Sequence, residues 1–173
     1  MQPYYLFRLI SATLFFKLKC IIIFAAMHDV VIKIINTSGN NLPEYATAGS
    51  AGMDIRASLQ IPVILQPLER AMVPTGIFLE IPPGYEAQMR PRSGLAIKQG
   101  ITCLNSPGTI DSDYRGELKV ILINLSAQQQ TINNGERIAQ VVISKVERAL
   151  LQPVEQLESS LRGEGGFGHT GKI

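Results

Sequence analysis

The segment NSPGTIDSDYRGE, residues 105–117, gathers residue types that take part in chemistry. It holds three acids, an arginine, a tyrosine and an asparagine between turn-forming residues. The D-x-D spacing of Asp111 and Asp113 is compatible with two metal ligands. The same composition is also typical of a polar hairpin tip. The segment alone leaves both interpretations open.

A second candidate is RPRSGLA, residues 90–96, where Arg92, Ser93 and Gly94 follow one another. Exposed N–H groups, a hydroxyl and a guanidinium can together hold a phosphate. Arg-Ser-Gly turns are common, however, and a capped structural turn is the simpler interpretation. The motif alone is therefore a weak indication of phosphate binding.

Two further segments carry polar groups in apolar surroundings. In AGMDIRA, Asp54 lies next to a turn glycine, and it could satisfy local backbone, order water around a metal or orient an arginine. In GERIAQ, Arg137 and Gln140 interrupt an apolar strand, as residues on an exposed strand face also do. Each segment alone is explained by a structural role, with no part in binding or catalysis.

The glycine-rich end, RGEGGFGHTG, matches the dinucleotide fingerprint G-x-G-x-x-G only by spacing. That fingerprint requires a preceding strand and a following helix, and here the chain ends five residues later. A tail without fixed structure is one interpretation. A lid over an anionic, ring-bearing ligand is the other, because glycine backbone approaches phosphate closely and arginine binds it in bidentate fashion. The lid residues would be Arg162, Phe167, His169 and Thr170.

Taken together, AGMDIRA, PRSGLA, NSPGTIDSDYRGE, GERIAQ and RGEGGFGHTG resemble the five motifs of the trimeric dUTPase family, in the family's order and spacing. The resemblance covers residues 30–171. It implies a jelly-roll-like, all-β barrel with very little helix, and a homotrimer whose three active sites are shared between chains. It also implies hydrolysis of dUTP to dUMP and diphosphate with Mg²⁺, which keeps uracil out of DNA and supplies dUMP for dTMP synthesis.

The resemblance assigns a role to each acid of these motifs. Asp111 matches the carboxylate that activates the attacking water, which as a general base contributes ~10²–10⁴-fold to the rate. Asp54 matches the first-motif acid, linked to the metal through water or to a phosphate-binding arginine. Asp113 receives no chemical role, and we expect it to have a structural partner such as an arginine.

The resemblance also implies a set of substrate contacts. The phosphate ligands would be Arg92, Ser93, Gly94, Gln140 and Arg162. Asn105 would recognise the uracil edge, Tyr114 would lie against the sugar and exclude a 2′-hydroxyl, and Phe167 would cover the base. Thr109, Ile110 and Lys119 would line the nucleoside pocket, and Gly168, His169 and Thr170 would add contacts from the last motif.

This chain departs from the common pattern of the family in two places. His169 stands where a serine is frequent, so the phosphate contact that it makes should depend on pH. The N-terminal segment, residues 1–28, is an addition that the compact bacterial-type enzyme does not need.

The elements that position these motifs are predicted to be short strands. Runs rich in Val and Ile recur about every ten residues between Gly and Pro, which is typical of a sandwich or barrel. The expected strand segments are 30–35, 61–67, 71–82, 85–93, 101–110, 116–126 and 136–146, and the Gly/Ala-rich stretch 46–58 is expected to end in a strand. One short helix is expected at SGLAIKQG, capped by Ser93 and ended by Gly100.

Length and composition indicate one domain with a substantial core. The chain has 173 residues, of which 46% are apolar and 17% charged, and its net charge of +2 gives no indication of a nucleic-acid partner. Two cysteines outside any Cys/His cluster argue against structural zinc and fit a reducing, cytoplasmic compartment. We expect a barrel at residues 29–160 and a flexible lid at 161–173.

Residues 1–28 are apolar and basic, and several interpretations stay open. Arg8, Lys17 and Lys19 argue against a membrane span, and FAAMHD is a poor signal-peptide cleavage site. An organelle transit peptide fits in part. In the remaining interpretation, Met27 is the true start of the protein. No membrane partner is expected for the catalytic domain.

Two alternatives to dUTP hydrolysis exist for a chain of this pattern. dCTP deaminase, alone or bifunctional, shares the fold but lacks the D-x-D-Y arrangement and the full glycine-rich motif. A non-catalytic nucleotide-binding relative would be expected to have lost ligands that this chain retains, among them Asp111, Ser93, Arg162 and Tyr114.

Overall fold

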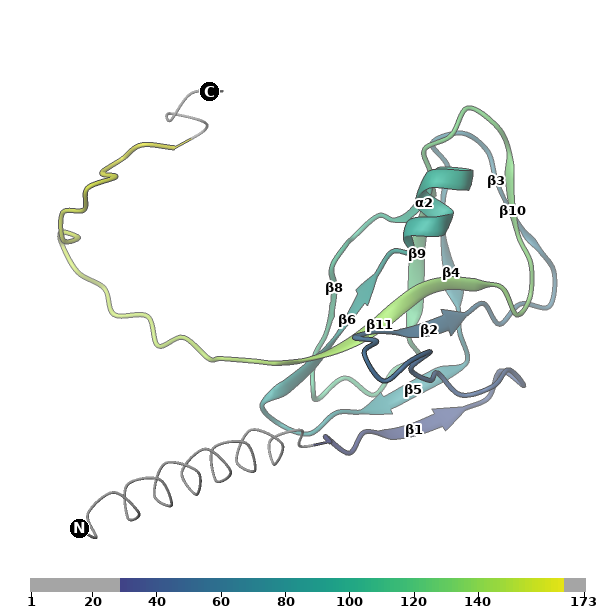
Figure 1. The fold of residues 1–173 in the computed structure, drawn as a ribbon, viewed down its shortest axis with the longest axis horizontal. Helices are drawn as coiled ribbons and strands as arrows, with labels where there is room; N and C mark the ends of the chain where they lie inside the picture. Colours follow the sequence, from purple (N-terminus) through teal and green to yellow (C-terminus); the bar gives the residue numbers. More distant parts are fainter. Residues whose placement is uncertain (1–28, 167–173) are drawn as a thin grey trace, which may run out of the picture.

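The computed structural model describes residues 29–166, which form a jelly-roll-like barrel of short strands with one short helix (Figure 1). All strand pairs among these residues are antiparallel. The all-β expectation is therefore confirmed. The elements are β1 (Lys33–Asn36), β2 (Met53–Arg56), β3 (Val63–Leu65), β4 (Arg70–Pro74), β5 (Ile77–Glu80), β6 (Tyr85–Arg90), α2 (Ser93–Gln99), β7 (Ile101–Cys103), β8 (Gly108–Ile110), β9 (Lys119–Asn124), β10 (Gln130–Ile132) and β11 (Arg137–Lys145).

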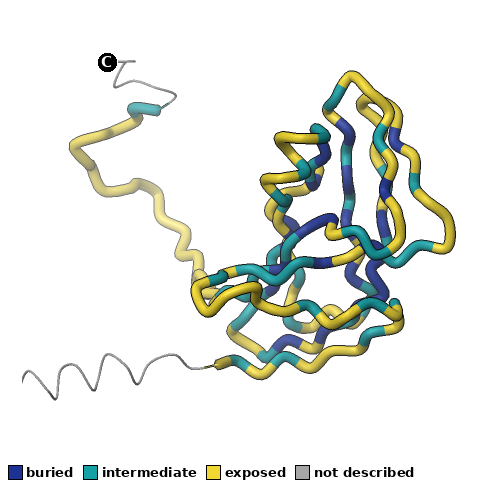
Figure 2. The backbone as a smooth tube through the Cα atoms, turned by 45° about the vertical axis from the view of Figure 1, so that its right-hand side comes forward, coloured by how far each residue is buried: buried dark blue, intermediate teal, exposed yellow. Residues whose placement is uncertain are grey.

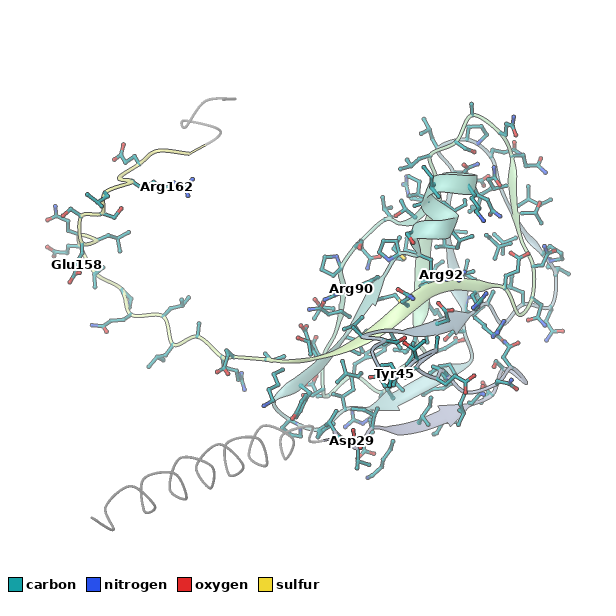
Figure 3. The ribbon with its side chains drawn as sticks, viewed as in Figure 1. Asp29, Tyr45, Arg90, Arg92, Glu158 and Arg162 are labelled. Atoms are coloured by element: carbon teal, nitrogen blue, oxygen red, sulfur yellow. The ribbon has the colours of Figure 1, made fainter. Side chains whose placement is uncertain are left out.

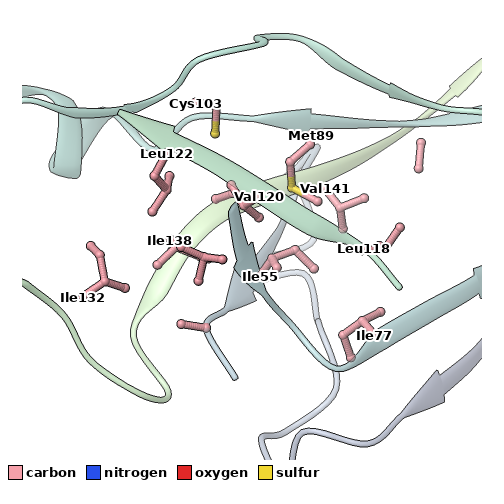
Figure 4. Packing of buried hydrophobic residues seen from close by; sticks show 14 of the residues in the cluster. Ile55, Ile77, Met89, Cys103, Leu118, Val120, Leu122, Ile132, Ile138 and Val141 are labelled. Atoms are coloured by element: carbon pink, nitrogen blue, oxygen red, sulfur yellow. The ribbon is translucent and has the colours of Figure 1, made fainter. Parts of the chain in front are cut away.

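The strands pair into small sheets that together enclose one core. The largest has the order β2-β11-β6-β8, a second has the order β4-β9-β7, and β1-β5 and β10-β3 form two-stranded pairs. Val120 and Leu122 of β9 join Met89 of β6 and Val141 of β11 in one buried cluster (Figure 4). The inner faces of the two larger sheets thus supply the same core.

Strand β9 shows how the sequence pattern produces this arrangement. In KVILIN, Val120, Leu122 and Asn124 are buried, and the residues between them are more exposed. Alternate residues of a strand point to opposite faces, so one face of β9 enters the core. Asn124 is fully buried and donates to the carbonyl oxygens of Leu65 and Gln128 at 2.9 and 2.8 Å.

The structure divides two segments that the sequence presents as continuous. Segment 71–82 is split into β4 and β5 at Gly76, which has φ +67° and packs so tightly that an added Cβ would lie 2.7 Å from Ser38 Cβ. Segment 101–110 is split into β7 and β8. Strand β10 was not predicted, because its residues QTI lie in the polar run AQQQTINN, residues 127–134, which lacks the Val- and Ile-rich pattern of the other strands.

The expected helix is present as α2. Gly100 ends it in the left-handed conformation, with φ 65°, as predicted. The prediction that Ser93 caps it is wrong, because Arg92 occupies the N-cap position and makes no side-chain cap hydrogen bond. The Arg92 side chain is instead engaged with other strands, as described below.

Residues 146–166, here called the C-terminal arm, leave the end of β11 and run away from the barrel (Figure 1). These residues are almost all exposed (Figure 2). The domain boundaries expected after residue 28 and after residue 160 stay predictions.

In residues 29–166, no helix is long and apolar enough to cross a membrane. Cys103 is buried in the core, and this burial raises the pKa of its thiol to about 11.

Candidate active site

The predicted nucleoside-binding residues line one cavity of ≈ 420 Å³. Six residues assigned from the sequence contribute to it: Asn105, Thr109, Ile110, Asp111, Tyr114 and Lys119. They come from the β7–β8 loop, β8, the loop that follows it and the start of β9. The structure therefore brings these six residues together.

Sequence reasoning missed several residues of the same cavity. Apolar walls come from Met72 of β4, Met89 of β6 and Ile121 of β9. Met72 and Met89 precede the motif on other strands, Ile121 lies four residues beyond it, and no local pattern indicated any of the three. Glu117 also lines the cavity and lies inside the quoted motif, but it had received no role.

The loop after β8 is held by hydrogen bonds within itself. The backbone N–H of Tyr114 donates to the Asp111 carbonyl at 3.2 Å. Arg115 Nη1 donates to the carbonyls of Ser112 and Tyr114 at 2.7 and 2.9 Å. These bonds fix a tight turn that carries Asp111 at its start and Tyr114 at its end.

The Tyr114 ring lies across Gly116. A Cβ added at Gly116 would lie 2.5 Å from the Cζ atom of Tyr114, so only glycine leaves room for the ring there. The Tyr114 hydroxyl donates to the Glu117 carbonyl at 3.1 Å. The hydroxyl end of the ring is thus held by the close approach of Gly116 and by the bond to the Glu117 carbonyl.

A second polar group is centred on Asp54 of β2. Its Oδ1 forms an ion pair with Arg92 Nε at 2.9 Å, and its Oδ2 accepts a hydrogen bond from Arg137 Nη1 at 3.0 Å. Gln140 Nε2 lies 3.4 Å from Oδ1. Arg92 Nη1 also donates to the Arg137 carbonyl at 2.9 Å. Of the roles open to Asp54, the geometry therefore supports the orientation of arginines.

This second group does not line the nucleoside cavity. Arg92, Ser93, Gly94 and Gln140 are absent from the cavity wall, and Ser93 and Gly94 are exposed at the start of α2. Arg162 lies on the C-terminal arm, far from Arg92 in Figure 3. One chain thus holds the predicted nucleoside residues and the predicted phosphate residues in separate places.

Asp111 and Asp113 do not form a metal site with their neighbours. The part of the chain described, residues 29–166, contains no group of three His, Cys, Asp or Glu side chains that could hold a metal ion. The arginine partner expected for Asp113 is not found there either, because Asp113 takes part in none of the ion pairs of these residues. Arg115, the nearest candidate in sequence, bonds to backbone carbonyls.

Four assigned residues lie outside the described part of the chain: Phe167, Gly168, His169 and Thr170. Their roles stay predictions.

Comparison with known proteins identifies the family. A family model described as dUTPase matches residues 39–171. The chain belongs to the dUTPase family. Among curated proteins it is similar to the deoxyuridine 5'-triphosphate nucleotidohydrolase of Cytophaga hutchinsonii, with 61% identity over 141 residues that cover 82% of this chain and 92% of the relative. The Fusobacterium nucleatum protein of the same name is 58% identical over 146 residues, which cover 84% of this chain and 100% of the relative.

Solved structures of dUTPases share the fold. The dUTPase of Staphylococcus bacteriophage 80alpha, solved with dUpNHpp, matches with a TM-score of 0.72 and 29% identity over 82% of this chain and 98% of that one. A mutant dUTPase of phage phi11 of S. aureus, described with a structural Mg(II) ion, matches with a TM-score of 0.65 and 26% identity over 75% and 99% of the two chains.

Proposed function

We propose that this dUTPase-family chain hydrolyses dUTP to dUMP and diphosphate. The observation that carries the proposal is one cavity lined both by the predicted base, Asp111, and by five predicted nucleoside contacts: Asn105, Thr109, Ile110, Tyr114 and Lys119. Family membership and the curated relatives support the same activity. The reaction keeps uracil out of DNA and supplies dUMP for dTMP synthesis.

Asp111 is the general base in this proposal. Its carboxylate lines the nucleoside cavity, within the turn fixed by the Asp111–Tyr114 backbone bond. It accepts a proton from water as the water oxygen bonds to the α-phosphorus, and the bond from that phosphorus to the bridging oxygen breaks to release diphosphate. Such transfers depend mainly on positioning and charge neutralisation.

The phosphate chain is bound by Arg92, Ser93, Gly94 and Gln140. Their separation from the nucleoside cavity supports a site completed by a second copy of the chain, and thus a homotrimer with shared sites. Arg162 and the last motif, with Phe167 over uracil and contacts from Gly168, His169 and Thr170, close the site as a lid at residues 161–173. The exposed C-terminal arm is long enough to reach beyond its own barrel.

Mg²⁺ is the proposed cofactor, and the donor set fits a metal that arrives with the substrate. Mg²⁺ is commonly bound by one or two carboxylates together with phosphate oxygens and water. Asp54 has both oxygens engaged by arginines, so any contact it makes with the metal runs through water. The ion, when bound, neutralises charge on the phosphates.

We also place the enzyme in the cytoplasm, because the two cysteines of the chain form no disulfide framework and its substrate belongs to the nucleotide pool for DNA synthesis. The proposed catalytic domain spans residues 29–160, and the strands of its barrel end with β11 at Lys145.

Diphosphate release from dUTP, with UTP, dTTP and dCTP as comparison substrates, tests this function. Release of ammonia from dCTP would instead indicate the deaminase. Asp111→Asn should lower kcat by ~10²–10⁴-fold and leave the dissociation constant of dUpNHpp within about threefold. Full activity in Asp111→Asn would overturn the assignment of the base.

A further inference from the structure

Glu117 joins the nucleoside cavity to a turn on another strand pair. Its side chain is 22% exposed and lines the cavity. Its Oε1 accepts the backbone N–H groups of Thr75 and Gly76 at 3.2 and 2.8 Å. One carboxylate oxygen therefore ties the motif that holds Asp111 and Tyr114 to the turn between β4 and β5.

That turn is a rigid anchor. Thr75 is 1% exposed, and its Oγ1 donates to the Leu118 carbonyl at 2.6 Å. The Leu118 N–H donates to the Ile77 carbonyl at 2.8 Å. Gly76 is packed against Ser38, with no space for a side chain. Core packing thus fixes the turn. The hydrogen bonds from Thr75 and Gly76 to Glu117 then fix the position of the cavity wall relative to that turn.

The other contacts of Glu117 lead to groups that face the nucleoside. Its carbonyl accepts the Tyr114 hydroxyl at 3.1 Å. Its Oε2 lies 3.6 Å from Lys119 Nζ. A shift of the Glu117 backbone would therefore move the tip of the Tyr114 ring, which is the group proposed to exclude a 2′-hydroxyl.

We propose that Glu117 is a positioning residue that sets the discrimination between deoxyribonucleotide and ribonucleotide. The proposal rests on the proposed function. Loss of the Glu117 carboxylate leaves two backbone N–H groups unpaired and frees the end of the loop that holds the ring. Functional groups must be held within about 0.5 Å of their productive geometry, so this freedom weakens the exclusion of ribose.

The test compares Glu117→Ala, Glu117→Gln and a matched control. Glutamine retains an oxygen that can accept both N–H groups but loses the charge next to Lys119. Glu69→Ala is the control, because the Glu69 carboxylate also accepts a backbone N–H, that of Gln66 at 2.8 Å, in a turn outside the cavity. For each variant, kcat/KM is measured for dUTP and UTP, together with the dissociation constants of dUpNHpp and its ribonucleotide counterpart and the melting temperature.

Glu117→Ala should lower the dUTP/UTP ratio of kcat/KM about tenfold, and the ratio of the two affinities should fall in parallel. Glu117→Gln should recover most of this loss, and Glu69→Ala should leave both ratios unchanged. If Glu117→Ala does not fold, Glu117→Asp replaces it with the same expected fall, because its side chain is one methylene too short for both N–H groups.

A lower melting temperature with unchanged ratios would overturn the proposal, as would equal losses in Glu117→Ala and Glu117→Gln. The ratio of the two dissociation constants in each variant tests the role of Glu117 without a measurement of turnover. A wild-type chain that bound both analogues but released no diphosphate would count against the proposed function alone.

Discussion

The Asp54 carboxylate forms ion pairs with the guanidinium groups of Arg92 at 2.9 Å and Arg137 at 3.0 Å, so one acid orients two cations. The three side chains come from β2, the residue before α2 and the start of β11. Because Arg92 is the central proposed phosphate ligand, the position of its charge depends on an acid that is distant in sequence.

Asp54→Ala should therefore raise KM for dUTP about tenfold or more, since a hydrogen bond to a charged group contributes about 1.5–3 kcal/mol. Steady-state kinetics at saturating Mg²⁺ measures this effect. Asp113→Asn, which alters an acid without an ion pair in the described residues, should leave KM within about twofold. An unchanged KM in Asp54→Ala would show that Arg92 is oriented by other groups.

Gly116→Ala should disturb the selection against ribose. The added Cβ would meet the Tyr114 ring at 2.5 Å from Cζ, so the ring must move away from its position in the cavity. We expect the dUTP/UTP ratio of kcat/KM to fall about tenfold. Gly49→Ala is the control, because no heavy atom lies within 4 Å of a Cβ added there. Equal ratios in the two variants would contradict the proposed role of the ring.

Asn124→Ala should destabilise the barrel by about 3 kcal/mol, because buried partners lose their hydrogen bonds. Asn124 donates to Leu65 and Gln128 and accepts from the N–H and hydroxyl of Ser126 at 2.9 and 2.7 Å. Urea unfolding at one fixed protein concentration measures the change. Asn133→Ala, on the exposed surface, should cost under about 0.5 kcal/mol. Similar losses of unfolding free energy in Asn124→Ala and Asn133→Ala would refute the stabilising role given to the hydrogen bonds of Asn124.

The last motif is expected to respond to pH through His169. The ordinary pKa of histidine is ~6.5, so its positive charge next to phosphate is lost as pH rises from 6 to 8. KM for dUTP should therefore rise more over this range in the wild type than in His169→Ser. Superimposable KM profiles for the two proteins would remove this role of His169.

Much of the fold could be predicted because its signals are local. Short Val- and Ile-rich runs between Gly and Pro indicated antiparallel strands, and Gly100 marked the end of the only helix in residues 29–166. The Ser93 cap was predicted wrongly, since a serine before an apolar run does not show where the helical hydrogen bonds begin. Strand β10 was missed because it lies in the polar run AQQQTINN, which gives no apolar strand signal.

The residues of the candidate site also fall into those that the sequence predicted and those that it did not. The motif residues indicated the chemistry, and six of them meet in one cavity because they lie within fifteen residues of one another along a folded-back segment. Met72 was not predicted to line the cavity, because its place in the cavity wall depends on how β4 pairs with a strand distant in sequence. The register between β4 and β9 sets Met72 opposite Ile121.

The order of residues in the chain thus established the family motifs and the strand pattern, and the family resemblance that these motifs carry predicts Asp111 as the acid that activates water. The fold decided which partners these groups have. Asp54 holds arginines because β2 pairs with β11, and Glu117 binds the turn at Thr75 because β4 pairs with β9. Side-chain partners across strands depend on long-range register, which hydrogen bonding and core packing fix only when the whole barrel forms.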